Sequence, residues 1–177
     1  MCLDIRNAMH QGVVEPAEVL HAAVTLDVTA RRAESIDVNP ETLGVVEALL
    51  DAACPAIGAA CQIPVQGREG AGFLRYEPGG FYRRHRDRGS AADWPGAARR
   101  LISVVVFLNN SSSEPAPGTF GGGELLVCSE PPGGAGTMAP VTIVPRQGTL
   151  VAFDASTPHE VCPVHWGTRD VIVDWYY

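Results

Sequence analysis

A histidine and a carboxylate two residues apart are the side chains whose types and spacing first suggest chemistry in this 177-residue sequence. They are His85 and Asp87, within LRYEPGGFYRRHRDR at residues 74–88. If residues 81–87 form a strand, both side chains point to one face, about 7 Å apart along a backbone that rises ~3.3 Å per residue. A third ligand from elsewhere would complete the facial triad with open positions that non-haem Fe(II) oxygenases use.

Two histidines near the end of the chain are candidates for that third ligand, His159 and His165, and Arg169 follows them. Burying a guanidinium near a metal is costly unless it meets an anion, and its planar fork matches a carboxylate. Two histidines, an aspartate and this arginine therefore imply an iron site with a dicarboxylate cosubstrate. The residue types alone leave the choice between His159 and His165 open.

The strands that must position these residues are predicted from about residue 70 onward, where short apolar, β-branched runs alternate with turns rich in Gly and Pro. We expect strands at 72–76, 81–87, 99–110, 121–127, 141–145, 149–154, 159–164 and 169–177. A turn at Gln147-Gly148 is expected to join two of them, 141–145 and 149–154, as a hairpin. Long loops at 111–120 and 129–140 are typical of functional or mobile segments.

About eight such strands predict a mainly β fold, a double-stranded β-helix of the jelly-roll or cupin type. Strand parity predicts that Ser103, Val105 and Phe107 share one face. By the same rule the side chains of Arg169 and Trp175 share a face, which places Trp175 inside the barrel. We expect one domain over residues 1–177, with the β-helix core at 70–177.

Residues 1–62 are expected to form a helical support packed on one sheet, with breaks before residue 30 and a weak edge strand at 33–38. Asn39-Pro40 has the pattern of an N-cap followed by a first-turn proline, so a helix should begin there. Pro55 and Gly58 should kink or end this helix.

Composition and charge narrow the function classes. The net charge of −7 disfavours binding to nucleic acid, which requires a basic face. No long apolar segment suggests a leader or a membrane span, and five cysteines without a CxxC pair suggest free thiols in a reducing cytoplasm. Five arginines nonetheless crowd one stretch, as a solvated face or as a mouth that attracts an anionic ligand: Arg75, Arg83, Arg84, Arg86 and Arg88.

Taken together and in order, these segments resemble the prolyl-hydroxylase-like 2-oxoglutarate/Fe(II) dioxygenases, over about residues 72–177. The family's Tyr, Gly turn, second Tyr and His-x-Asp pattern is matched by Tyr76, Gly79-Gly80, Tyr82, His85 and Asp87. Later motifs are matched by SVVVFLNN, Gly122-Gly123-Glu124, the set Pro145, Gly148 and Phe153, and the set His159, Arg169 and Trp175. The tail is most similar to hypoxia-sensing prolyl hydroxylases and their bacterial relatives.

The resemblance implies that His85, Asp87 and His159, rather than His165, hold Fe(II). It further implies that Arg169 binds the distal carboxylate of 2-oxoglutarate, the cosubstrate, with ascorbate as a possible reductant.

The cosubstrate site is expected to include Tyr76, Val161 and Trp175 beside this arginine. Phe107 departs from the family, because hypoxia-sensing relatives carry a tyrosine there that reaches toward the cosubstrate. The strand after the Gly-Gly-Glu motif also departs, reading LLV.

The implied activity is hydroxylation of an unactivated C–H bond, with O2 consumed and succinate and CO2 released. The expected substrate is a prolyl residue of a peptide or protein, or a free amino acid. Because Asp87 is retained, hydroxylation is expected rather than halogenation. Two alternatives stay open: a tailoring hydroxylase of a small secondary metabolite, and a non-catalytic cupin-like module that only binds metal.

Overall fold

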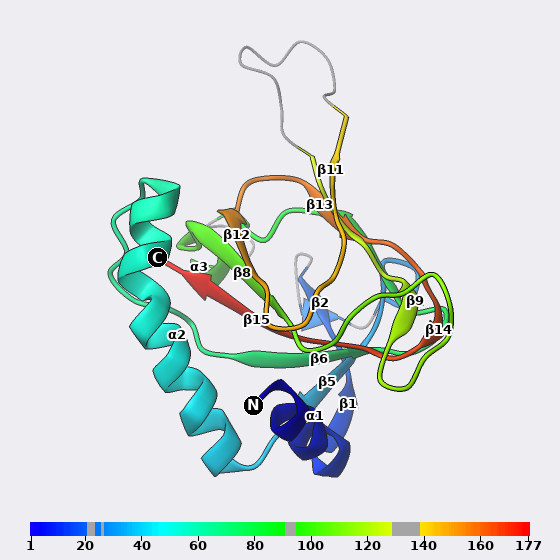
Figure 1. The fold of residues 1–177 in the computed structure, drawn as a ribbon. Coiled ribbons are helices and arrows are strands. Elements are labelled where there is room, and N and C mark those ends of the chain that lie inside the picture. The colour runs from blue at the N-terminus through cyan, green and yellow to red at the C-terminus, as the bar shows by residue number, and fades with distance from the viewer. Residues whose placement is uncertain (21–23, 26, 91–94, 129–138) are drawn as a thin grey trace.

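Two antiparallel sheets form the framework of the computed structural model, which describes residues 1–20, 24, 25, 27–90, 95–128 and 139–177 (Figure 1). The six-stranded sheet has the order β1 (Val13–Pro16), β5 (Glu34–Asp37), β6 (Gly72–Tyr76), β15 (Arg169–Tyr176), β8 (Ile102–Phe107), β12 (Leu150–Asp154). The five-stranded sheet has the order β11 (Val141–Ile143), β10 (Leu125–Val127), β13 (His159–Val161), β7 (Phe81–His85), β4 (Arg31–Arg32). This confirms the predicted jelly roll.

Two smaller pairs and a short helix complete the strands and loops. The pairs are β9 (Phe120–Gly122) with β14 (Val164–Gly167), and β2 (Val19–Leu20) with β3 (Val24–Thr25). The helix α3 spans Pro95–Ala98. The five cysteines all lie within the described residues and are free, as the sequence predicted.

The inner faces of the two large sheets share one hydrophobic cluster. Leu74, Phe107 and Val171 come from the six-stranded sheet, and Leu125 and Val161 from the five-stranded sheet. The predicted common face of β8 is confirmed, because Ser103, Val105 and Phe107 lie opposite Trp175, Val173 and Val171 of β15.

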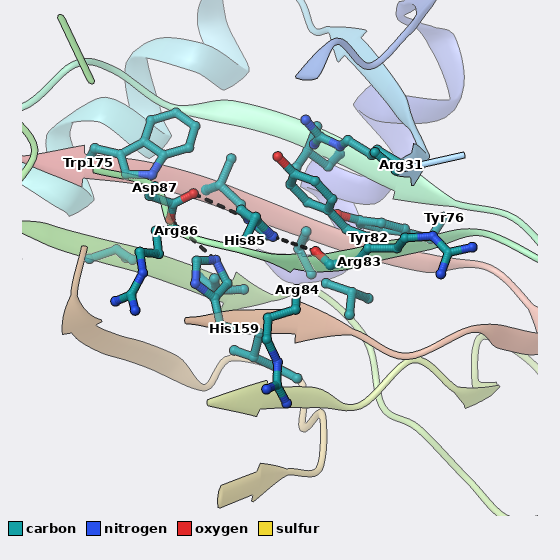
Figure 2. Close-up of a pocket in the computed structure, with 18 of the residues that line it drawn as sticks. Arg31, Tyr76, Tyr82, Arg83, Arg84, His85, Arg86, Asp87, His159 and Trp175 are labelled. Atoms are coloured by element: carbon teal, nitrogen blue, oxygen red, sulfur yellow. Dashed lines mark hydrogen bonds and ion pairs between the residues drawn. The ribbon is translucent and has the colours of Figure 1, made fainter. Parts of the chain in front are cut away.

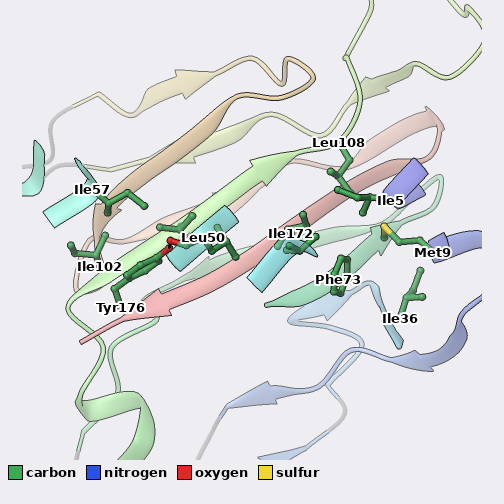
Figure 3. Close-up of a cluster of buried hydrophobic side chains, with 12 residues drawn as sticks. Ile5, Met9, Ile36, Leu50, Ile57, Phe73, Ile102, Leu108, Ile172 and Tyr176 are labelled. Atoms are coloured by element: carbon green, nitrogen blue, oxygen red, sulfur yellow. Dashed lines mark hydrogen bonds between the residues drawn. The ribbon is translucent and has the colours of Figure 1, made fainter. Parts of the chain in front are cut away.

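The helices α1 (Cys2–Gln11) and α2 (Pro40–Cys61) cover the outer face of the six-stranded sheet (Figures 1 and 3). Leu50 and Ile57 of α2 pack in one cluster with Phe73 and Ile172 of the sheet. The Tyr176 hydroxyl donates to the Leu50 carbonyl at 2.9 Å, which adds a polar link to this contact.

The start of α2 agrees with the prediction, but its end does not. The Asn39 side chain accepts a hydrogen bond from the Thr42 N–H at 2.9 Å, and Pro40 is the first helical residue. Pro55 does not end the helix, which continues to Cys61. Burial of Ile57 against the sheet stabilises the turns beyond the proline.

By length and composition alone, α2 could cross a membrane: it has 22 residues, and the mean hydropathy of its 18-residue window is 1.6. This is weak evidence, since core helices of soluble proteins pass the same test. The helix carries Glu47 and Asp51, which both pair with Arg68. Its buried side chains pack on the sheet.

The predicted helical support, expected with breaks before residue 30 and a weak edge strand at 33–38, is wrong between the two helices. Val13–Pro16 pairs with Glu34–Asp37, which in turn pairs with β6, so the strand at 33–38 lies inside the sheet rather than at its edge. Residues 17–24, expected to be helical, include β2 and the start of β3, and 21–23 lie outside the described residues. Pairing with the sheet decides this conformation, and local propensity does not.

Three strand predictions after residue 120 also need correction, and one of them is the strand at 159–164, because β13 ends at Val161 and β14 begins at Val164 in another sheet. The segments 141–145 and 149–154 do not form a hairpin, because β11 pairs with β10 while β12 pairs with β8 of the other sheet. The predicted strand 121–127 is two strands, and the chain changes sheets at Gly122 and Gly123, both with positive φ. Of the loop at 129–140, residues 129–138 lie outside the described residues.

Candidate metal centre

A cavity of about 400 Å³ lies between the two large sheets and contains the residues singled out from the sequence (Figure 2). Its walls include both predicted histidines and the aspartate, together with the expected cosubstrate residues: His85, Asp87, His159, Tyr76, Val161, Arg169 and Trp175. His165 is exposed on β14 and is not part of the cavity wall.

The strands β7 and β13 bring the two histidines together, because His85 and His159 are paired across them. Asp87 lies beyond β7, which ends at His85, so the predicted strand 81–87 is two residues too long. The Asp87 and Arg88 N–H groups donate to the Ala155 carbonyl at 3.1 and 2.9 Å, which holds this segment beside the sheet.

A bulge in the pairing of β7 with β13 sets the direction of Tyr82. His159 is opposite His85, but Val161 is opposite Tyr82, so the three residues 159–161 of β13 face the four residues 82–85 of β7. In a regular strand, residues three apart point to opposite faces. The bulge lets the Tyr82 ring stack on the His85 ring, with centroids 3.5 Å apart and planes 19° apart.

The three side chains present their donor atoms to one point. The Nε2 atoms of His85 and His159 each lie 3.4 Å from an Asp87 carboxylate oxygen, and one donor atom from each residue lies within 4.8 Å of the others. The Nδ1 atoms lie 2.8 Å from the Arg83 carbonyl and 3.0 Å from the Thr157 carbonyl. A carbonyl partner fixes the proton on Nδ1, which leaves Nε2 free to bind a metal.

The electrostatics of the cluster suit a cation. Burial alone would raise the pKa of Asp87, but the hydrogen bond with His85, the charges of both histidines and the Ser103 hydroxyl lower it below its usual value. Burial is the largest effect on His159 and lowers its pKa, which favours the neutral imidazole. An ionised carboxylate and a neutral imidazole are the forms that bind metal.

Two residues that hydrogen-bond to Asp87 were not predicted from the sequence. The Ser103 hydroxyl donates to the Asp87 carboxylate at 2.6 Å, and Arg100 donates to the Asp87 carbonyl at 3.3 Å. The Arg100 guanidinium also lies 3.7 Å from the centre of the Trp175 ring and is paired with Glu69 at 2.7 Å. A serine on the inner face of the most apolar strand was the available signal for Ser103. Nothing in the sequence singled out Arg100.

Arg169 fits a site for an anion. Its side chain is 1% exposed, its Nε donates to the Gly123 carbonyl at 2.9 Å, and its buried Nη2 has no hydrogen-bond partner. Burial lowers the pKa of this guanidinium by disfavouring its charged form. A buried donor without an acceptor is rare and costly, so this atom marks where a ligand carboxylate would bind.

The packing around Arg169 leaves no room for a side chain at Gly123. It also places the ring of Phe107 beside the guanidinium. A Cβ on Gly123 would lie 2.9 Å from the Arg169 Cδ, and this residue has φ of +67°. The guanidinium carbon lies 4.9 Å from the Tyr76 ring centre and 5.3 Å from the Phe107 ring centre. Phe107 is therefore beside the arginine and offers it a ring face.

Two histidines, one carboxylate and open space on a jelly roll define the class of mononuclear non-haem Fe(II) enzymes. Within the described residues, this is the one group of at least three candidate ligands that could hold a metal ion.

Residues 71–177 match the family model of the 2OG-Fe(II) oxygenase superfamily, and the chain belongs to this superfamily. Fe(II) and 2-oxoglutarate are accordingly its cofactors, and the donors described above fit both of them. A PKHD-type hydroxylase of Acaryochloris marina is 36% identical over 103 residues, which are 58% of this chain and 39% of that protein. The matched region is thus about two fifths of the length of this curated relative.

Solved structures resemble almost the whole chain. A Pseudomonas putida prolyl-4-hydroxylase has a TM-score of 0.70 and 27% identity, and the match covers 99% of this chain and 82% of that one. A Trichoplax adhaerens prolyl hydroxylase in complex with a peptide fragment of hypoxia inducible factor has a TM-score of 0.73 and 20% identity, covering 99% and 75%. The second likeness shows the fold alone.

Proposed function

We propose that this protein is a hydroxylase that uses Fe(II), 2-oxoglutarate and O2 to hydroxylate a prolyl residue in a peptide or protein. The observation that carries this proposal is one cavity with three converging metal donors and a buried guanidinium whose Nη2 lacks a partner. Similarity to the P. putida prolyl-4-hydroxylase supports the choice of substrate.

In this proposal His85, Asp87 and His159 hold the metal through three protein atoms, which leaves coordination positions for the cosubstrate and O2. When bound, Fe(II) would allow O2 to act as the oxidant: 2-oxoglutarate would give up two electrons and CO2 and take one oxygen atom to become succinate, and the other oxygen atom would enter a substrate C–H bond. Arg169 binds the distal carboxylate of the cosubstrate through its free Nη2.

The cavity walls around the donors orient the reactants and exclude water. Val161, Val171 and Val173 give the inner surface an apolar character, and Tyr76 flanks Arg169. Trp175 stands at the Asp87 end of the cavity, where Arg100 covers its ring (Figure 2). A dry pocket limits side reactions and strengthens the electrostatic contacts inside it.

The test is turnover with proline-containing peptides, followed by succinate release and by a mass gain of one oxygen atom in the peptide. Asp87→Ala should abolish both signals, and Arg146→Gln, an exposed change outside the cavity, should preserve them. Full turnover by Asp87→Ala, or a wild-type protein that produces no succinate with any peptide, would contradict the proposal.

A further inference from the structure

The cavity has a surplus of positive charge that neither the metal nor the cosubstrate uses. Six arginines and three acidic residues line it. Arg100 is paired with Glu69, Arg169 faces the cosubstrate site, and Asp87 belongs to the metal centre. The other charged side chains of the wall are Arg31, Arg83, Arg84, Arg86 and Glu18, of which Arg84 is ion-paired with Glu160 and Arg86 donates to the Ser156 carbonyl. This local surplus stands against a chain charge of −7, so it is not a general property of the surface.

The guanidinium of Arg31 has one buried hydrogen-bond donor for which the protein provides no acceptor. Arg31 comes from β4, opposite Tyr82 of β7, and its guanidinium carbon lies 4.7 Å from the Tyr82 ring centre. One terminal nitrogen donates to the Glu18 carbonyl at 2.8 Å, while the buried Nε has no partner. An orphaned donor on a stacked guanidinium at the cavity wall indicates a position for an acceptor from a ligand.

Arg84 is the second arginine of the cavity wall to consider, and its ion pair with Glu160 is long. Its Nε lies 3.8 Å from the Glu160 carboxylate, too far for a hydrogen bond, and its side chain is 53% exposed. Figure 2 shows Arg31 and Arg84 on opposite sides of the stacked rings of Tyr82 and His85. Both arginines belong to the wall of the cavity that contains the metal centre.

We propose that Arg31 and Arg84 recognise an acidic side chain of a peptidyl substrate, two or three residues from the residue that is oxidised. This rests on the proposed function. The stacking distances of 4.7 and 3.5 Å place the Arg31 guanidinium within about 8 Å of the His85 ring centre. An extended peptide covers that separation with about two to three residues, at ~3.3–3.6 Å each.

The choice of a peptide over a free amino acid follows from the proposed function and not from this distance. A neighbouring Asp or Glu side chain in a peptide reaches Arg31 with the oxidised residue still at the metal. The specificity proposed here is thus for an acidic flank.

The experiment measures binding, so that it does not depend on turnover. Fluorescent peptides with one central proline are made in pairs, with Asp or Asn at one position from three residues before the proline to three after it. Anisotropy titrations use the full chain with 2-oxoglutarate and Mn(II) in place of Fe(II). At least one Asp peptide should bind roughly tenfold more tightly than its Asn twin, because a charge-assisted hydrogen bond replaces a neutral one. Added salt should reduce this advantage.

Single substitutions test whether Arg31 and Arg84 cause the preference for Asp peptides over Asn peptides. Arg31→Gln and Arg84→Gln should each reduce the advantage of Asp over Asn to less than about threefold. Arg146→Gln removes the same charge from an exposed position outside the cavity and should leave the advantage intact. If Arg31→Gln does not fold, Arg31→Lys and Arg84→Gln still provide the test, because Lys keeps the charge but not the stacked fork. Equal binding of the twins, survival of the preference in both Gln variants, or no binding of any peptide would overturn the proposal.

The same peptides with Fe(II) separate this inference from the proposed function. Equal hydroxylation of Asp and Asn peptides would retain the hydroxylase and remove the acidic preference. Asp-dependent binding that Arg31→Gln abolishes, with no oxygen added to any peptide, would retain the recognition and remove the hydroxylase.

Discussion

Removal of the Ser103 hydroxyl tests how the structure prepares Asp87 for a metal. This hydroxyl donates to the carboxylate at 2.6 Å, and Ser103 is 1% exposed on β8. A hydrogen bond to a charged group contributes about 1.5–3 kcal/mol, and outer partners of metal ligands are worth roughly 10- to 100-fold in metal affinity. Ser103→Ala should therefore weaken Fe(II) binding by about one to two orders of magnitude.

Anaerobic titration calorimetry with Fe(II), repeated with Mn(II), measures this change directly. Ser103→Thr is the matched control, because it keeps the hydroxyl and its β-branched side chain suits a strand. A thermal melt without metal shows whether the Ala variant keeps its fold. If folded Ser103→Ala binds Fe(II) within twofold of the unchanged protein, the hydroxyl does not prepare Asp87 and the reasoning fails.

Three further predictions concern the anion site and the core. Arg169→Lys should raise the dissociation constant for 2-oxoglutarate by roughly 10- to 100-fold, because the charge remains but the fork is lost; an unchanged value from calorimetry would contradict the assignment. Gly123→Ala should weaken 2-oxoglutarate binding, since its Cβ would lie 2.9 Å from Arg169, whereas Gly148→Ala, with φ of +79° and nothing within 4 Å, strains the backbone alone and should leave the affinity unaltered. Leu50→Ala should lower the unfolding free energy by about 2–5 kcal/mol in denaturant titrations, whereas Leu49→Ala, at a position 45% exposed, should change it far less.

The sequence was sufficient to predict which residues meet at the centre, although one of its premises was wrong. Same-face placement of His85 and Asp87 was expected from a strand through residue 87, yet β7 ends at His85. Asp87 reaches the site because its N–H is bonded to the Ala155 carbonyl, a contact between segments far apart in sequence. Metal chemistry restricts the ligand types so strongly that they were identifiable without the correct backbone.

The N-terminal strands were not predictable in the same way. Glu34–Asp37 pairs with β6, and Val13–Pro16 pairs in turn with Glu34–Asp37; weak alternation at 33–38 indicated the first of these strands but not its place inside the sheet, and no local pattern indicated the second. For the same reason Arg31 was not predicted as a cavity residue, since its place at the cavity depends on the pairing of β4 with β7. Residues that select a substrate are bound by fewer chemical rules than metal ligands, so their sequence signal is weaker.

The two sheets contribute different parts of the site, and this separates stability from chemistry. The five-stranded sheet supplies both histidines and the stacked Tyr82, while the six-stranded sheet supplies Ser103 and Arg169. The α2 helix packs on the outer face of the six-stranded sheet, in a cluster distinct from the one between the sheets. Changes under α2 should therefore lower stability while the folded fraction keeps its affinity for metal and cosubstrate, whereas changes between the sheets alter both.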